Sequence, residues 1–274
     1  MDEKNESNLD LTNLTIFTAV NNYFLLFFGL ACVMSSLYLQ GLFLYFGLIR
    51  IGISVSAAVG IILPVYVITR RFPVGFRRQL HIHPPNIRCA FYVLVSTILT
   101  VVIIDFVYIL SQELFPVPSE FMESLEILKP DGLVAVIVTF LGLCIIVPIA
   151  EELVFRGLVQ QVFSRNMNGI LAFIMAGVFF GVIHLNAHLL ISISIYGIFL
   201  GFIFYATQNL SYTILSHAAF NTVSFIQLTA TQPEQFTEPP FYVKDIRVIV
   251  AAIVLLAFFL RKIKKETPGR SLPD

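Results

Sequence analysis

The chain has 274 residues, of which 57% are hydrophobic and only 12% are charged, and its formal net charge at pH 7 is zero. Soluble domains carry about 25% charged residues, so this composition, with a mean hydropathy of +0.86, excludes an ordinary soluble protein. The three cysteines, Cys32, Cys89 and Cys144, lie in or beside apolar runs and form neither a disulfide framework nor a CxxC metal site. We therefore interpret them as packing residues.

Several uncharged runs, such as 51–69, 132–150 and 169–183, approach the roughly 20 residues that span a bilayer core. They predict an all-α protein, a polytopic transmembrane helical bundle that forms a single integral membrane domain over residues 1–274. The first apolar run of the chain, 16–48, is long for one crossing, so we expect a tilted or broken helix there. The sequence "TQNLS" at 207–211 predicts a break between two later helices. We expect about eight helices, at 16–48, 51–69, 89–110, 133–164, 169–186, 188–207, 210–229 and 243–263.

The charged residues of the connecting segments predict the orientation of the bundle. Residues 70–88 hold five arginines and no acid, whereas residues 111–132 hold five acids and one lysine. Residues 231–245 are also mainly acidic, and the tail 261–274 is mainly basic. Because Lys/Arg-rich loops stay cytoplasmic, we place 70–88 and the tail inside and the two acidic segments outside. His81 and His83 of the first loop are interpreted as solvated interface residues, and the acidic start "MDEKNESNLD" lacks the basic region of a signal peptide.

The stretch "PIAEELVFRG", residues 148–157, places three ionisable groups after a long uncharged run. Ionisable groups at membrane depth are costly and are functional candidates by default. On a helix, Glu152 and Arg156 stand at i and i+4 and can neutralise each other. Glu151 lies about 100° round the helix, so it is the better candidate for a proton acceptor. A structural ion-pair cluster that locks two helices is the alternative reading.

Two further motifs lie on later apolar segments. "FFGVIH" places Phe180 and His184 at i and i+4, and "SHAAFN" places His217 and Asn221 at i and i+4. A lone membrane histidine is often only an interhelical hydrogen bonder. Together, however, these residues and Glu151 supply a base, a polarising imidazole and a donor pair able to hold an oxyanion. No strong serine or cysteine nucleophile motif accompanies them, so hydrolysis would use an activated water.

In this order, EExxxR, FxxxH and HxxxN resemble the motifs of the CAAX protease and bacteriocin-processing family, whose eukaryotic branch is the Ras-converting prenyl endopeptidase. The resemblance covers roughly residues 130–230, the expected catalytic core, and includes the glycine-spaced run 196–221. It implies an intramembrane glutamate endopeptidase in which Glu151 and His184 activate water and His217 and Asn221 form the oxyanion site. Glu152 and Arg156, with Phe180, would order the cleft.

The resemblance also implies partners and a location. We expect membrane lipid and a peptide or protein substrate, prenylated or not, with no nucleic acid, no metal and no other cofactor. The protein would be a multi-pass integral membrane protein, of the cell membrane in a bacterium or of the endoplasmic reticulum in a eukaryote.

Three alternatives stay open. A non-catalytic immunity or regulatory protein would keep the fold and bind a peptide. A zinc-dependent membrane protease would use His184 and His188, at i and i+4 in "HLNAH", with Glu151 or His217 completing the site, although the Glu of HExxH is missing. A transporter would use Glu151 and Asp105 as proton carriers, although no repeat pairs two halves of the chain; we interpret Asp105 as a buried structural acid.

The depths of the candidate residues conflict on simple counting. A helix that begins outside near residue 133 carries Glu151 deep toward the cytoplasm. One that begins inside near residue 169 carries His184 about 22 Å back across the membrane, at 1.5 Å per residue. The two depths meet if the fourth helix starts later and runs on to about residue 164, or if the fifth helix begins in the interface.

Overall fold

The structure is a computed structural model that describes residues 13–230 and 240–267. The acidic N-terminal stretch, most of the 231–245 segment and the last residues of the basic tail lie outside the described residues. Within the described part the protein is all-α, with no β-strand. The predicted fold class is confirmed.

The eight predicted helices are all present, several with shifted ends. The helices of the first half are α1 (Ile16–Ala19), α2 (Asn22–Tyr45), α3 (Ile49–Ala57), α4 (Leu63–Thr69), α5 (Phe76–Gln79), α6 (Ile87–Ser111) and α7 (Ser119–Leu128). Those of the second half are α8 (Gly132–Phe140), α9 (Val147–Val154), α10 (Gln160–Asn166), α11 (Gly169–Val182), α12 (Leu190–Thr207), α13 (Leu210–Ala230) and α14 (Ile246–Glu266).

Five of the described helical segments are long and apolar enough to cross a membrane, and α11 is a shorter apolar helix. The five run over Asn22–Tyr45, Ile49–Thr69, Ile87–Ser111, Gly132–Asn166 and Ala187–Thr207. Many large apolar side chains on these segments are exposed, as expected for helices whose outer faces meet lipid rather than water. The protein is an integral membrane protein.

Two predicted breaks are present. The first helix is interrupted after α1, where Val20 is extended and the Asn21 side chain accepts a hydrogen bond from the backbone N–H of Tyr23, starting α2. The sixth and seventh helices are separated at Gln208, which takes the left-handed conformation that ends α12.

Three sequence-based expectations need correction. The fifth helix was predicted to reach residue 186, but α11 ends at Val182 and the chain turns before a short 3₁₀ turn at Ala187–Leu189. Helix α7, inside the segment expected to be an external loop, was not predicted. The loop residue His83 is exposed as expected, whereas His81 is half-buried and its carbonyl accepts a hydrogen bond from the N–H of Leu210.

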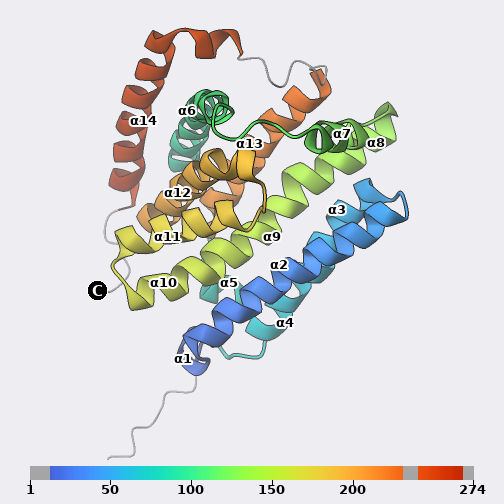
Figure 1. The fold of residues 1–274 in the computed structure, drawn as a ribbon. Helices are drawn as coiled ribbons and strands as arrows, with labels where there is room; N and C mark the ends of the chain where they lie inside the picture. Colours follow the sequence, from blue (N-terminus) through green and yellow to red (C-terminus); the bar gives the residue numbers. More distant parts are fainter. Residues whose placement is uncertain (1–12, 231–239, 268–274) are drawn as a thin grey trace, which may run out of the picture.

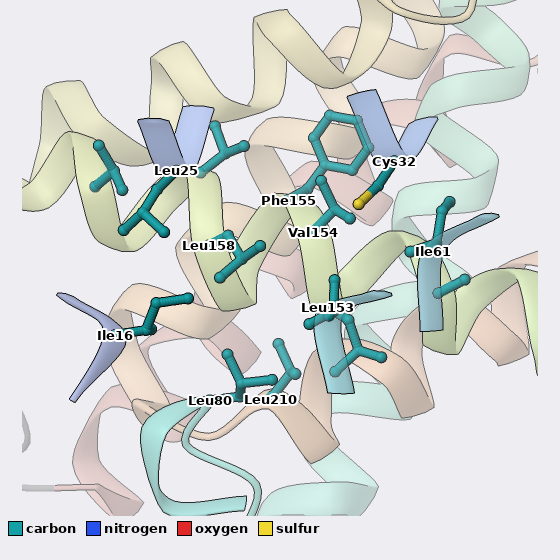
Figure 2. Close-up of a cluster of buried hydrophobic side chains, with 14 of the residues drawn as sticks. Ile16, Leu25, Cys32, Ile61, Leu80, Leu153, Val154, Phe155, Leu158 and Leu210 are labelled. Carbon is teal, nitrogen blue, oxygen red and sulfur yellow. The ribbon is translucent and has the colours of Figure 1, made fainter. Parts of the chain in front are cut away.

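Figure 1 shows the continuous helical segment from α8 through α9 to α10 crossing the molecule, with α2 and α3 along one side and α11 to α13 on the other. A buried apolar cluster joins these parts: Leu153, Phe155 and Leu158 of the central segment meet Leu25 of α2 and Leu80 of the first loop (Figure 2). A second cluster joins α6, α12, α13 and α14. Cys32, Cys89 and Cys144 are buried, as expected for packing residues.

Candidate active site

The helix that carries the EExxxR motif is the longest in the described chain and changes its winding on both sides of the motif. Between α8 and α9, residues Leu141–Ile146 are π-helical, and between α9 and α10, residues Phe155–Val159 are π-helical. Pro148 follows the first of these segments. Because proline has no N–H and its ring clashes with the carbonyl four residues earlier, a wider turn before it is physically expected. π-Helical turns frequently mark functional sites, and here two of them bracket Glu151 and Glu152.

The length of this helix removes the conflict between the depths of Glu151 and His184. The helix runs from Gly132 to Asn166, close to the predicted 133–164, and α11 begins three residues later. Fifteen residues separate Glu151 from Asn166, and fifteen separate Gly169 from His184. At 1.5 Å per residue, both groups lie about 22 Å from the same tight turn between two packed helices. The fourth helix therefore runs on to Asn166 but does not start later than predicted, so only the second half of the first solution applies.

Glu152 and Arg156 form a fully buried ion pair with 0% side-chain exposure on both partners. Nη1 of Arg156 donates to Oε1 of Glu152 over 2.7 Å, and Nη2 donates to the Gly197 carbonyl of α12 over 2.8 Å. The guanidinium also stands 4.8 Å from the centre of the Phe180 ring, in a cation–π contact. The predicted i,i+4 pair is present, and it links the EExxxR helix to both α11 and α12.

The same Glu152 oxygen holds His217 of α13. Its distance to His217 Nδ1 is 2.9 Å. Because a carboxylate paired with Arg156 accepts hydrogen bonds, Nδ1 of His217 carries the proton and donates it. This leaves Nε2 of His217 turned toward Glu151, 3.6 Å from its Oε2 atom. His217 therefore connects the two neighbouring glutamates.

Glu151 differs from Glu152 in its surroundings. Its side chain keeps 23% of its exposure and lines a cavity, whereas Glu152 is sealed from it. Arg156 hydrogen bonds to Glu152, and the contact of Glu151 within 4 Å is to His217. The predicted pairing of Glu152 with Arg156 is present, and the proton-accepting role of Glu151 stays a prediction.

His184 stands just past the end of α11 and is also held by one nitrogen. Its Nδ1 is 2.6 Å from the carbonyl oxygen of Phe180. A carbonyl can only accept, so Nδ1 is the protonated nitrogen, and in the neutral ring Nε2 keeps a free lone pair. The ring packs edge-on against Phe180, with ring centres 4.8 Å apart. The FxxxH motif thus sets both the tautomer and the orientation of the imidazole.

Asn221 of α13 is tied to the π-helical segment before Pro148. Its Nδ2 donates to the carbonyl oxygen of Leu143 over 2.8 Å. The amide has a second N–H and an acceptor oxygen that this bond does not use. In this structure Asn221 therefore joins α13 to the central helix, and it also lines the cavity.

The predicted catalytic residues come together in one cavity of about 440 Å³. Its lining includes Glu151, His184, His217 and Asn221, which come from three different segments of the chain, together with Phe180. Apolar side chains from α6, α7, α9 and α13 line much of the rest. A mostly apolar cavity with a few convergent polar groups is the usual form of a small-molecule or peptide site.

Two glycines let helices α11 and α12 cross at close range beside the site. A Cβ atom at Gly177 of α11 would stand 2.3 Å from the Ile198 nitrogen, and one at Gly197 of α12 would stand 2.6 Å from the Gly177 oxygen. Small residues at such crossings let membrane helices approach closely. The crossing also presents the Gly197 carbonyl that Arg156 binds.

The proposed histidine pair of a zinc site is not on one helical turn. Because α11 ends at Val182, His184 lies in a turn, whereas His188 lies in the 3₁₀ turn and packs on Phe121 of α7, with ring centres 4.3 Å apart. Within residues 13–230 and 240–267, no three His, Cys, Asp or Glu side chains form a group that could hold a metal ion. His184 and His188 therefore do not share the helical turn that the zinc alternative requires.

Some residues of the site were not predicted. Tyr196 of α12 is buried, stacks on Phe220 with ring centres 3.9 Å apart, and stands edge-on to His217. The missed α7 contributes Phe121, Leu125 and Leu128 to the cavity. Their i, i+4, i+7 spacing inside an acidic segment is the signal of an amphipathic helix, so this part was readable from the sequence.

The fold and the cavity define a polytopic helical membrane protein with an acid–histidine site buried between its helices. Residues 133–223, which hold all three motifs, match the family model described as type II CAAX prenyl endopeptidase Rce1-like. This match confirms, over residues 133–223, the resemblance found in the sequence. No curated protein and no solved structure gives a significant match to the chain.

Proposed function

We propose that this protein is an intramembrane endopeptidase that hydrolyses peptide bonds with a water molecule activated by Glu151 and His184. One observation carries the proposal: Glu151, His184, His217 and Asn221, from three separate motifs, line a single cavity. Packing alone does not require an acid, two tautomer-fixed imidazoles and an amide to converge there. The family match adds that relatives of this segment are described as prenyl endopeptidases.

In the proposed reaction, Glu151 takes a proton from the water, and His184 accepts a hydrogen bond from the same water through Nε2. The hydroxide attacks the carbonyl carbon of the scissile bond. The negative charge that develops on the carbonyl oxygen is held by an N–H of the Asn221 amide and by the Nε2–H of His217, which the ring carries in its doubly protonated form because its Nδ1–H is donated to Glu152. Glu151 then returns its proton to the leaving amine nitrogen as the C–N bond breaks, which yields a carboxylic acid and an amine.

Glu152 and Arg156 act on this reaction through His217. Glu152 fixes Nδ1 of the ring, so that Nε2 faces the reacting groups, and Arg156 keeps Glu152 in place. The buried carboxylate holds the imidazole in its reacting orientation. Less reorganisation is therefore needed to reach the transition state than with a freely rotating ring.

The test is to incubate the purified protein, in detergent or in liposomes, with a mixture of synthetic peptides and to identify cleavage products by mass spectrometry. We expect defined products from the wild type and loss of most of the rate in His184→Ala. His83→Ala is the matched control, because His83 is an exposed loop residue outside the cavity. Equal cleavage by both variants, or an activity that disappears with chelation and returns only with zinc, would contradict the proposed mechanism.

A further inference from the structure

A second carboxylate lines the same cavity as Glu151 but lies outside the family match. Asp105 belongs to α6, is partly buried and faces the cavity. Two donors reach the same oxygen of this carboxylate: Nε2 of Gln227 stands 3.4 Å from Oδ2, and the Tyr242 hydroxyl donates to Oδ2 over 2.5 Å. Both donors therefore bind the Oδ2 atom of Asp105, and neither of these hydrogen bonds uses Oδ1.

The charges in the cavity are unbalanced. Asp105 and Glu151 both line it, whereas no Lys or Arg side chain among the described residues does. Arg156, the nearby cation, is fully buried behind the wall and is already bound to Glu152 and the Gly197 carbonyl. The imidazoles of His184 and His217 also line the cavity, and each is already held through Nδ1, by the Phe180 carbonyl and by Glu152 respectively. A carboxylate in so apolar a setting is energetically costly unless it binds a cation or a strong hydrogen-bond donor. The cavity therefore favours a positively charged ligand.

The side chains next to Asp105 suit a long basic residue. Ile104, Phe225 and Leu228, which lie within two residues of Asp105 or of its partner Gln227 in the sequence, line the same cavity with apolar surface. Lysine and arginine bury their aliphatic stems on such surface while the charged head meets a polar partner. A free ammonium group or guanidinium can donate to Oδ1 without displacing Gln227 or Tyr242.

We propose that Asp105 is a specificity-determining residue that binds a lysine or arginine side chain of the peptide substrate inside the cavity. The inference rests on the proposed function, because it names a feature of that enzyme's substrate. The competing account is that Asp105 only clasps α6 to α13 and to the Phe241–Lys244 turn. The two accounts differ in whether the negative charge of Asp105 is needed. Binding of a cationic side chain needs the charge, whereas a clasp needs only the acceptor oxygen.

The test measures binding separately from cleavage. A fluorescent apolar hexapeptide with one central lysine, and its counterpart with norleucine in place of lysine, are titrated into the Glu151→Gln protein in nanodiscs. The same titration is made with Glu151→Gln/Asp105→Asn, which keeps the acceptor oxygen but removes the charge. A charge-assisted hydrogen bond predicts that the lysine peptide binds about tenfold tighter or more to the first protein. In the second protein that preference should fall to near parity. An equal ratio of Kd values in both proteins would overturn the proposal.

Two further arms guard against misfolding. Tyr242→Phe, in the Glu151→Gln background, removes a clasp bond but keeps the Asp105 charge, so the lysine preference should survive in it. Pentylamine should also compete with the lysine peptide more strongly than pentanol does, a comparison that needs no change at Asp105. Equal competition by the amine and the alcohol would count against a cation site.

The outcomes also separate the inference from the proposed function. If the wild type cleaves peptides but the lysine preference does not depend on Asp105, the endopeptidase proposal stands and the inference fails. If no peptide is cleaved but Asp105→Asn abolishes the lysine preference, the cavity is a cation-binding site and the endopeptidase proposal fails.

Discussion

The His217 imidazole lies between the two adjacent glutamates, with Nδ1 2.9 Å from Oε1 of Glu152 and Nε2 3.6 Å from Oε2 of Glu151. The two carboxylates are neighbours in sequence but differ in environment, since one is sealed against Arg156 and the other borders the cavity. This difference gives each glutamate a separate role. In the proposed mechanism, Glu152 orients the ring and Glu151 exchanges a proton with water.

The buried pair predicts strong coupling between Glu152 and Arg156. Removing one partner leaves an uncompensated charge, so Glu152→Gln and Arg156→Met should each lower the free energy of unfolding by about 3–5 kcal/mol. The double variant should recover much of this loss, because no unpaired charge remains. Equilibrium unfolding of the four proteins in detergent measures the coupling energy, and simple additivity of the two losses would contradict the pairing.

Asn221 has two possible roles, which one variant separates. As an oxyanion donor it predicts that Asn221→Ala lowers the single-turnover rate by about 10²–10³-fold. As a clasp on the Leu143 carbonyl it predicts a lower melting temperature and an unchanged rate per folded molecule. Both quantities are measured on one preparation. The hydrogen bond to Leu143 makes some loss of stability expected in either case, so the rate per folded molecule decides the oxyanion role.

The glycine crossing of α11 and α12 predicts a steric effect. Gly177→Ala would bring a methyl group within 2.3 Å of backbone on the other helix, so the helices must separate. Overpacking of this kind typically costs about 1–3 kcal/mol, which thermal denaturation in detergent would detect. The matched control is Gly41→Ala in α2, where a methyl group meets nothing within 4 Å. Alanine is the better helix former, so the control should be neutral or stabilising, and an equal loss in both variants would contradict the close crossing.

The sequence predicts that residues 70–88 face the cytoplasm and residues 111–132 the opposite side. Gln79 is a poor labelling site, because its side chain is buried and bonds to the Ile16 N–H and the Thr69 carbonyl. Arg77 and Ser119 are exposed and serve instead. In a cysteine-free background, Arg77→Cys and Ser119→Cys should react with an impermeant maleimide from opposite faces of sealed vesicles. Labelling of both from one face would overturn the orientation.

Local patterns were the reliable part of the sequence. The i,i+4 spacing predicted the contact of Glu152 with Arg156, and the uncharged runs located the long helices within a few residues. The contact of His217 with Glu152 joins residues 65 positions apart, and no local spacing reveals it. The end of α11 was misplaced because the apolar pattern continues through Ile183 and Leu185 while the backbone turns. The common depth of Glu151 and His184 depends on where the turn between α10 and α11 falls, which composition does not fix.

The central claim is that Glu151 is the general base, and the most direct test compares Glu151→Gln with Glu113→Gln. Glutamine keeps the size of the side chain but cannot take a proton, and Glu113 is an exposed acid outside the cavity. Peptide cleavage is followed under single-turnover conditions, with melting temperature and extraction yield measured on the same samples. We expect Glu151→Gln to lose about 10²–10⁴-fold in rate while remaining folded, and Glu113→Gln to match the wild type. A folded Glu151→Gln protein that cleaves peptides at the wild-type rate would contradict the account.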